Sequence, residues 1–87
     1  AQATQNLIDL VNSLNLPHGL TNSLNVKLQA AMKSLNRGNQ IAAKNQLKAF
    51  MNQVKAKCCN RPPAKPLTTD QANMLIAEAQ EIIQAIT

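Results

Sequence analysis

Aromatic residues and glycines are nearly absent from this chain. Phe50 is the only aromatic residue among the 87, and Gly19 and Gly38 are the only glycines. With only one aromatic residue, a core must be built mainly from Leu, Ile, Val, Ala and Met, which favours helices packed on helices over strands. Two isolated glycines cannot form a glycine-rich phosphate loop, so nucleotide-binding fingerprints of that kind are excluded.

Acidic residues are also few. The chain has four Asp and Glu residues against nine Lys and Arg residues, which gives a formal net charge of +5. This balance weakly favours anionic partners and helps to keep the chain in solution. Asn and Gln supply much of the remaining polar surface. A surface of uncharged amides is compatible with secretion.

A long apolar run is missing as well. No stretch of about 18 apolar residues occurs, so the sequence predicts no transmembrane segment, and it contains no signal-peptide pattern. A chain of this length is expected to form one domain. We expect residues 1–87 to be a single helical module excised from a larger protein that is extracellular or exposed at the cell surface.

Apolar residues recur at helical spacing in four segments. We expect a short first helix over about residues 4–15, a second from residue 19 or 20 to 37, a third from about residue 40 to 57 or 58, and a fourth that opens with Thr68 as its N-cap. Four amphipathic helices of this size predict an all-α fold, a small antiparallel helical bundle. The predicted core residues are Leu24, Leu28, Leu35, Leu47, Phe50, Val54, Leu75, Ile76 and Ile83.

The connections carry start and stop signals for these helices. Gly38 suits the left-handed conformation that ends helices, and Asn39 is a good N-cap, so the second and third helices should form an antiparallel hairpin. Residues 60–66 contain three of the four prolines, which predicts a linker because proline blocks helix propagation. Thr68 and Gln71 have the spacing of a capping box.

Three stretches of the chain are similar to a known family. They are GLTNSL at residues 19–24 with KL at 27–28, NQLKAFMNQV at residues 45–54, and LT at 67–68 followed by the apolar pattern of residues 71–83. Together they resemble the FIMAH domain, over nearly the whole chain. The sequence departs from the family after Val54, where the family usually has a short Gly-Lys type turn and this chain has a longer link with two cysteines and three prolines.

The resemblance implies a role for the domain. FIMAH domains are small helical modules, typically near the C-terminus of large secreted or surface proteins of bacteria and archaea, including some polymer-degrading enzymes. The family has no established catalytic residues, so the resemblance implies a non-catalytic accessory module that binds or positions its parent at a polymer, a surface or a protein partner. Two alternatives stay open, a purely structural spacer or cap domain and a small carrier of apolar ligands.

Cys58 and Cys59 are adjacent, and several interpretations stay open. Adjacent Cα atoms lie about 3.8 Å apart across a trans peptide, which is closer than in most disulfides, so a bond between the two would be strained. A disulfide between two chains would instead make a dimer. A metal site is least favoured, because only His18 could add a further soft ligand. In the simplest interpretation, Cys58 closes the apolar stripe of the third helix and Cys59 is partly exposed.

The sequence contains no catalytic constellation. His18 has no nucleophile or acid at a meaningful spacing, and it fits a hydrogen-bonded turn residue. Asp9 faces away from the apolar stripe of its helix, and Asp70 complements the dipole of the fourth helix. Glu78 and Glu81 lie on the polar side of that helix. We therefore expect no enzyme activity, no cofactor and no metal.

Lysines provide the best candidate for a binding surface. Lys44, Lys48 and Lys55 lie beside the apolar stripe of the third helix at spacings of four and seven. Such a surface suits phosphate, a sulfated sugar, an anionic polymer or the cell envelope, and a plain solvated face is the alternative. Specific nucleic-acid binding is not expected, because Phe50 belongs to the core stripe and no recognised motif is present. The candidates for this basic face are Lys44, Lys48, Lys55, Lys57, Arg61 and Lys65.

Overall fold

The computed structural model describes residues 2–58 and 67–86. These parts of the chain form four helices and no strand, namely α1 (Gln2–Ser13), α2 (His18–Asn36), α3 (Gln40–Ala56) and α4 (Thr69–Ile86). The predicted all-α bundle with a short first helix is therefore confirmed. Of the predicted functional residues, Cys59, Arg61 and Lys65 lie outside the described residues.

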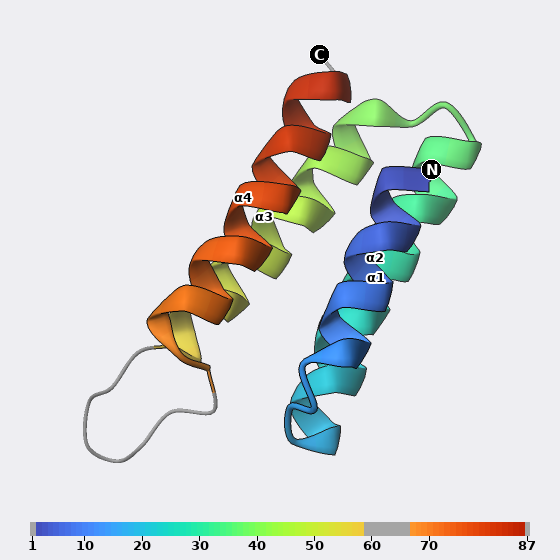
Figure 1. Cartoon of the computed structure of the whole chain (residues 1–87). Coiled ribbons are helices and arrows are strands. Elements are labelled where there is room, and N and C mark those ends of the chain that lie inside the picture. Colours follow the sequence, from blue (N-terminus) through green and yellow to red (C-terminus); the bar gives the residue numbers. More distant parts are fainter. Residues whose placement is uncertain (1, 59–66, 87) are drawn as a thin grey trace.

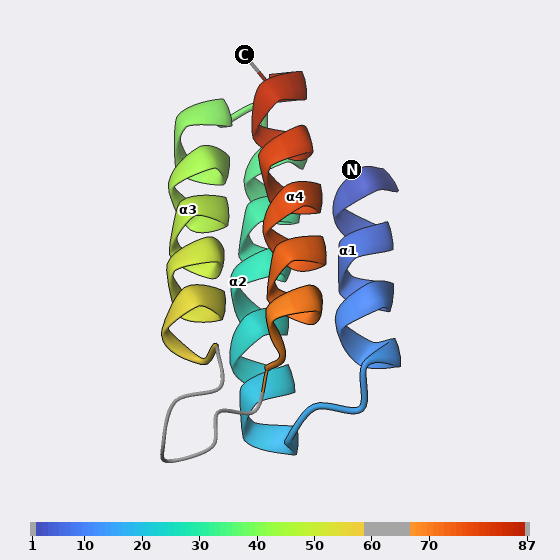
Figure 2. The same ribbon diagram turned by 60° about the vertical axis from the view of Figure 1, so that its left-hand side comes forward.

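The four helices alternate in direction (Figure 1 and Figure 2). The start of α1 and the end of α4 consequently lie at the same end of the bundle. Each helix packs on two others, in the closed order α1, α2, α3, α4 and back to α1, while the diagonal pairs have no close backbone approach. In Figure 1, α1 and α4 form the front layer, and α2 and α3 form the layer behind it.

The α2–α3 turn follows the local chemistry of the sequence. Gly38 has a φ of 77°, its N–H donates to the Leu35 carbonyl, and the Asn39 N–H donates to the Ser34 carbonyl. This pattern is a Schellman motif, which ends helices at glycine. The Asn39 Oδ1 atom accepts a hydrogen bond of 3.1 Å from the Ala42 N–H and so caps α3. The predicted hairpin is thus confirmed, with the signals that predicted it.

The start of α4 has the predicted capping box. The Gln71 N–H donates to Thr68 Oγ1, and the Thr68 N–H donates to Gln71 Oε1, both at 3.1 Å. Just before it, the Leu67 N–H donates to the Lys57 carbonyl at 3.1 Å, and the Leu67 side chain is buried. The Leu67–Lys57 bond holds the start of α4 against the end of α3.

The core is aliphatic around a single aromatic residue. Phe50 is the largest fully buried side chain. Three predicted core residues, Leu35, Ile76 and Ile83, are only partly buried. Leu35 lies in the last turn of α2. The two isoleucines lie at one edge of the apolar stripe of α4, and the residues at the centre of that stripe are smaller or more deeply buried. The predicted core residues that are buried are Leu24, Leu28, Leu47, Phe50, Val54 and Leu75.

Candidate functional site

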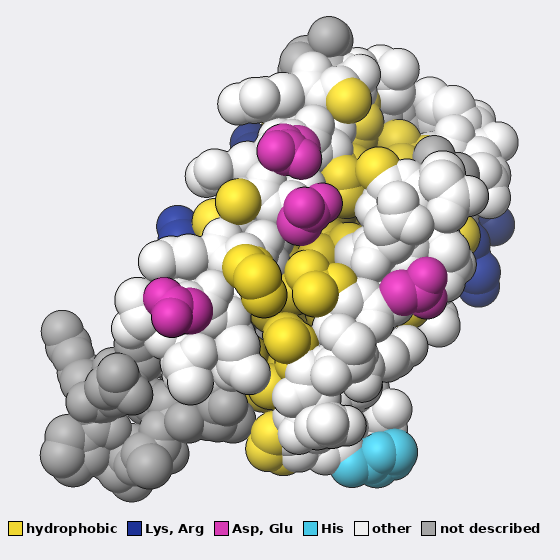
Figure 3. Space-filling model, in the orientation of Figure 1, with side chains coloured by type: hydrophobic (Ala, Val, Ile, Leu, Met, Phe, Trp, Pro, Cys, Tyr) yellow, Lys and Arg dark blue, Asp and Glu magenta, His cyan; other side chains and the backbone are white. Residues whose placement is uncertain are grey.

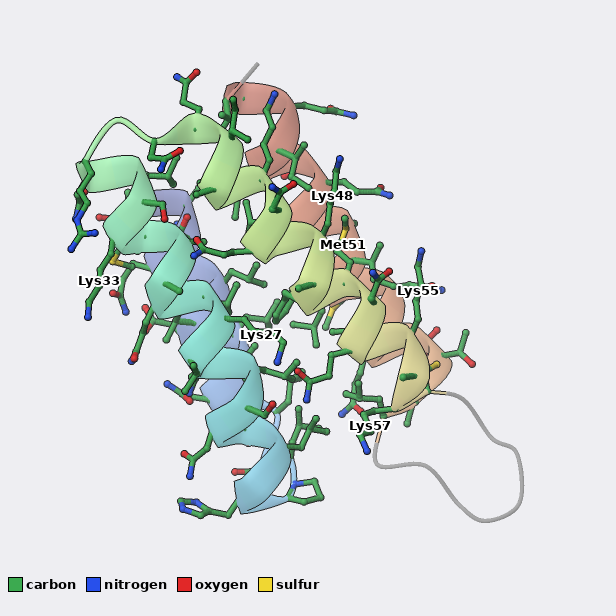
Figure 4. All side chains as sticks on the ribbon, turned by 180° about the vertical axis from the view of Figure 1, so that it is seen from behind. Lys27, Lys33, Lys48, Met51, Lys55 and Lys57 are labelled. Atoms are coloured by element: carbon green, nitrogen blue, oxygen red, sulfur yellow. The ribbon has the colours of Figure 1, made fainter. Side chains whose placement is uncertain are left out.

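The charges of the molecule divide between its two layers. All four acidic residues belong to the α1/α4 layer. Every described Lys and Arg belongs to α2, to α3 or to the C-cap residue of one of them. Figure 3 shows acidic side chains across the α1/α4 side, with Lys and Arg only at its edges, and Figure 4 shows lysines on the opposite side. The α2/α3 layer therefore carries positive potential, and the α1/α4 layer carries negative potential.

The structure divides the basic face that the sequence predicts. Residues spaced by four and seven share one flank of a helix, so Lys44 lies on the same flank of α3 as Lys48 and Lys55. Figure 4 shows Lys48 and Lys55 pointing away from α2, whereas Lys57 lies between α2 and α3 near one end of the bundle. Lys57, the C-cap residue of α3, follows Lys55 by two residues, which is about 200° around a helix axis and therefore the opposite flank. The four described members of the predicted set thus lie in one layer but not in one row, while Arg61 and Lys65 lie outside the described residues.

Lys27 belongs to the same layer and was not among the predicted residues. Its Nζ atom lies 3.4 Å from Ser23 Oγ, which also accepts a hydrogen bond of 2.7 Å from Gln53 Nε2. Further along, Ser34 Oγ donates to Gln46 Oε1 at 3.0 Å. These contacts join α2 to α3, so this polar group supports the packing of the layer. The spacing of Ser23, Lys27 and Ser34, again four and seven, is the sequence signal that could have found it.

Lys44, Lys48 and Lys55 form a row along α3, which we call the lysine row, and beside it α3 and α4 meet along a seam with an apolar floor. Three side chains here are partly buried against the core, namely Met51 on α3 and Ile76 and Ile83 on α4. We call these three residues and their surroundings the α3/α4 seam. In Figure 1, α4 rises with α3 behind it and α1 beside it. The right-handed turn of the helix then places Ile76 and Ile83 toward α3 and Glu78 toward α1. Figure 4 shows Met51 between Lys48 and Lys55.

A second surface, on the other side of the molecule, is apolar. Figure 3 shows a strip of hydrophobic side chains between α1 and α4, bordered by acidic residues. Leu10 and Leu14 belong to this side of α1, because they lie on the flank away from Asn12, whose Oδ1 accepts a hydrogen bond of 2.8 Å from Asn25 on α2. The strip offers apolar contact, and its acidic borders repel the anionic partners that the α2/α3 layer attracts.

The other candidate residues lie apart from one another. His18 is exposed at the start of α2, where Asn22 Nδ2 donates to its Nε2 atom at 3.2 Å, in agreement with the predicted hydrogen-bonded role. Asp70 lies in the first turn of α4, and Glu78 and Glu81 are exposed as predicted. Within residues 2–58 and 67–86, no three His, Cys, Asp or Glu side chains are grouped as metal ligands would be.

Cys58 follows α3 at the edge of the core. Its side chain is packed against the core cluster, as predicted for a residue that closes the α3 stripe. The Sγ atom lies 3.8 Å from the carbonyl oxygen of Thr68, at the start of α4. The two disulfide hypotheses stay predictions, because Cys59 lies outside the described residues.

None of the described helices has the length and hydropathy to cross a bilayer. The sequence matches no protein-family model, and neither a curated protein nor a solved structure shows a significant match to it. What the domain does must therefore be inferred from the chemistry of its surface.

Proposed function

We propose that the domain is a non-catalytic accessory module that holds its parent protein on an anionic polymer or surface through the α2/α3 layer. The division of charge between the two layers carries this proposal. A partner that meets the α2/α3 layer finds exposed Lys and Arg side chains and no acidic residue among the described positions. Long-range attraction to one layer and repulsion from the other would orient the domain before contact.

Two further features support a binding role over catalysis. The titratable residues that an enzyme would use are exposed and dispersed over α1, α2 and α4. The resemblance to the FIMAH domain, a module of secreted and surface proteins, fits an extracellular or cell-surface parent. In such a parent, an anchoring domain keeps an attached activity close to the polymer or envelope on which that activity works.

Sedimentation with insoluble anionic polymers and cell envelopes tests the proposal. The domain is mixed with each material at about 0.01 M and about 1 M salt, where the Debye length is roughly 30 Å and 3 Å. We expect retention at low salt that is lost at high salt, because exposed charges are screened efficiently. Retention that survives high salt would contradict an electrostatic face and indicate a shaped, less charged site. No retention at either salt concentration would contradict the proposal and favour the spacer hypothesis.

A pair of matched variants makes the test specific to charge. In the first, the four exposed lysines of the layer are replaced by Gln, and in the second the same four are replaced by Arg. We expect the Gln variant to lose retention and the Arg variant to keep it, since the positive charge is the property that the proposal invokes. Equal retention of both variants would contradict it. The four lysines are Lys33, Lys48, Lys55 and Lys57.

A further inference from the structure

We infer that the α3/α4 seam is a binding track for a linear acidic polysaccharide, which lies along α3 with its carboxylate or sulfate groups against the lysine row. This inference rests on the proposed function and names the class of polymer. It combines three features of the seam, namely a row of cations, an apolar floor and a bank of amides.

The cations form a straight row instead of a cluster. Lys44, Lys48 and Lys55 share one flank of α3. With a rise of about 1.5 Å per residue, their positions along the helix axis are separated by about 6 Å and about 10.5 Å. Lys48 and Lys55 are exposed, and Lys44 is partly exposed. A row with these intervals suits a polymer that carries anionic groups at regular distances, while a single small anion would need the cations to converge.

The floor of the seam is apolar and incompletely covered. Met51, Ile76 and Ile83 are packed against the core, yet each keeps part of its surface accessible. Sugar rings present C–H groups on their faces and polar groups at their edges. A sugar ring that lies on these three side chains therefore buries its C–H face, while the polar groups at its edges reach α3 on one side and α4 on the other. Met51 can adapt to the ring, because its side chain is unbranched and flexible.

The α4 bank of the seam carries two exposed amides. Asn73 and Gln80 are exposed, and each lies three residues before a floor isoleucine, on the same flank of α4. A side-chain amide offers two N–H donors and one carbonyl acceptor, which matches the hydroxyl groups of a sugar. The acidic Glu78 lies on the other flank, toward α1, so it does not oppose the anion. The seam is thus cationic on one bank and hydrogen-bonding on the other.

These features favour a polysaccharide over other polyanions. A single-stranded nucleic acid would need exposed aromatic rings for its bases to stack on, and Phe50 has no exposed surface. A polyphosphate would use the lysines, but it has neither ring faces for the floor nor sugar hydroxyls for the amides. Of these three polyanions, a charged glycan is the one that uses all three parts of the seam.

Binding of the whole chain to three soluble polymers tests the inference. The probes are polygalacturonate, inorganic polyphosphate and uncharged dextran, with affinity measured by titration calorimetry at low salt. We expect Lys48→Gln with Lys55→Gln to weaken polygalacturonate binding about tenfold. The matched control, Lys33→Gln with Arg37→Gln, removes the same charge from the last turn and the C-cap of α2, and Figure 4 shows Lys33 on the far side of the layer. We expect this control to weaken binding less than about threefold.

The amides give the second arm of the test. Asn73→Ala with Gln80→Ala should weaken binding of polygalacturonate several-fold and leave binding of polyphosphate unchanged, while Gln29→Ala with Asn36→Ala on α2 should affect neither. Equal losses in the Lys48/Lys55 variant and the Lys33/Arg37 variant, or amide variants without effect on polygalacturonate, would overturn the track and leave a general cationic surface. Failure of the chain to bind either polyanion would contradict the proposed function itself. Thermal unfolding of each variant verifies that it folds.

Discussion

Among residues 2–58 and 67–86, Thr4 is the only polar residue that is buried. Its side chain has no exposed surface, and its Oγ1 atom has no hydrogen-bond partner. A buried hydroxyl without a partner costs about 1–3 kcal/mol. Valine keeps the shape of threonine without the hydroxyl, so Thr4→Val should raise the free energy of unfolding by about 1 kcal/mol in urea titrations. Thr4→Ser, which keeps the hydroxyl and removes the methyl group, should lower it. A destabilised Val variant would mean that the hydroxyl is paired in solution.

Thr4 also shows where residue-scale prediction from sequence ends. The burial of Leu24, Phe50 and Leu75 could be predicted, since large apolar side chains at helical spacing form the core of a bundle. The same pattern assigns a threonine to the surface. Its burial depends on how closely the N-terminal turn of α1 packs on the neighbouring helices, which only the three-dimensional structure shows.

At the scale of the elements, the N-cap of α3 is a single side chain with a measurable effect. Asn39 Oδ1 satisfies the Ala42 N–H, which would otherwise lack a partner within the helix. Asn39→Ala should lower the free energy of unfolding by about 1 kcal/mol, which is a fall in Tm of roughly 4–8 °C for a domain of this size. Asn39→Asp keeps the acceptor oxygen and should retain most of the stability. Equal values of Tm for the Ala variant and the unchanged chain would contradict a capping role.

The elements divide into those with local signals and those without. The Schellman motif at Gly38 and the capping box at Thr68 could be predicted because their hydrogen bonds join residues a few positions apart. The flank shared by Lys48 and Lys55 could be predicted too, since spacing fixes the angle about a helix axis. Which neighbour that flank faces depends on the handedness of the bundle. The lysine row could therefore be predicted, but its place beside the floor and the amides of α4 could not.

At the scale of the whole molecule, opposite charge on the two layers predicts one orientation on a polyanion. A domain bound through the α3/α4 seam buries that edge of the molecule and leaves the acidic and apolar side of the α1/α4 layer in solvent. Two methionines report on this difference without any substitution. Met51 lies in the seam, and Met74 on α4 is 46% exposed. The helical period of about 3.6 residues per turn places Met74 on the solvent side of α4, about half a turn around the helix axis from Ile76.

Oxidation of the two methionines by dilute peroxide measures the orientation. With polygalacturonate in excess, Met51 should convert to the sulfoxide several-fold more slowly than in the free domain, because the polymer covers it, while the rate at Met74 should stay unchanged. Mass spectrometry of the peptides gives both rates in one sample, so each methionine is the control for the other. High salt should restore the rate at Met51, since it releases an electrostatically bound polymer. Equal protection of both methionines would mean that the domain binds in several orientations, and the charge division would then act as a general attraction without a preferred face.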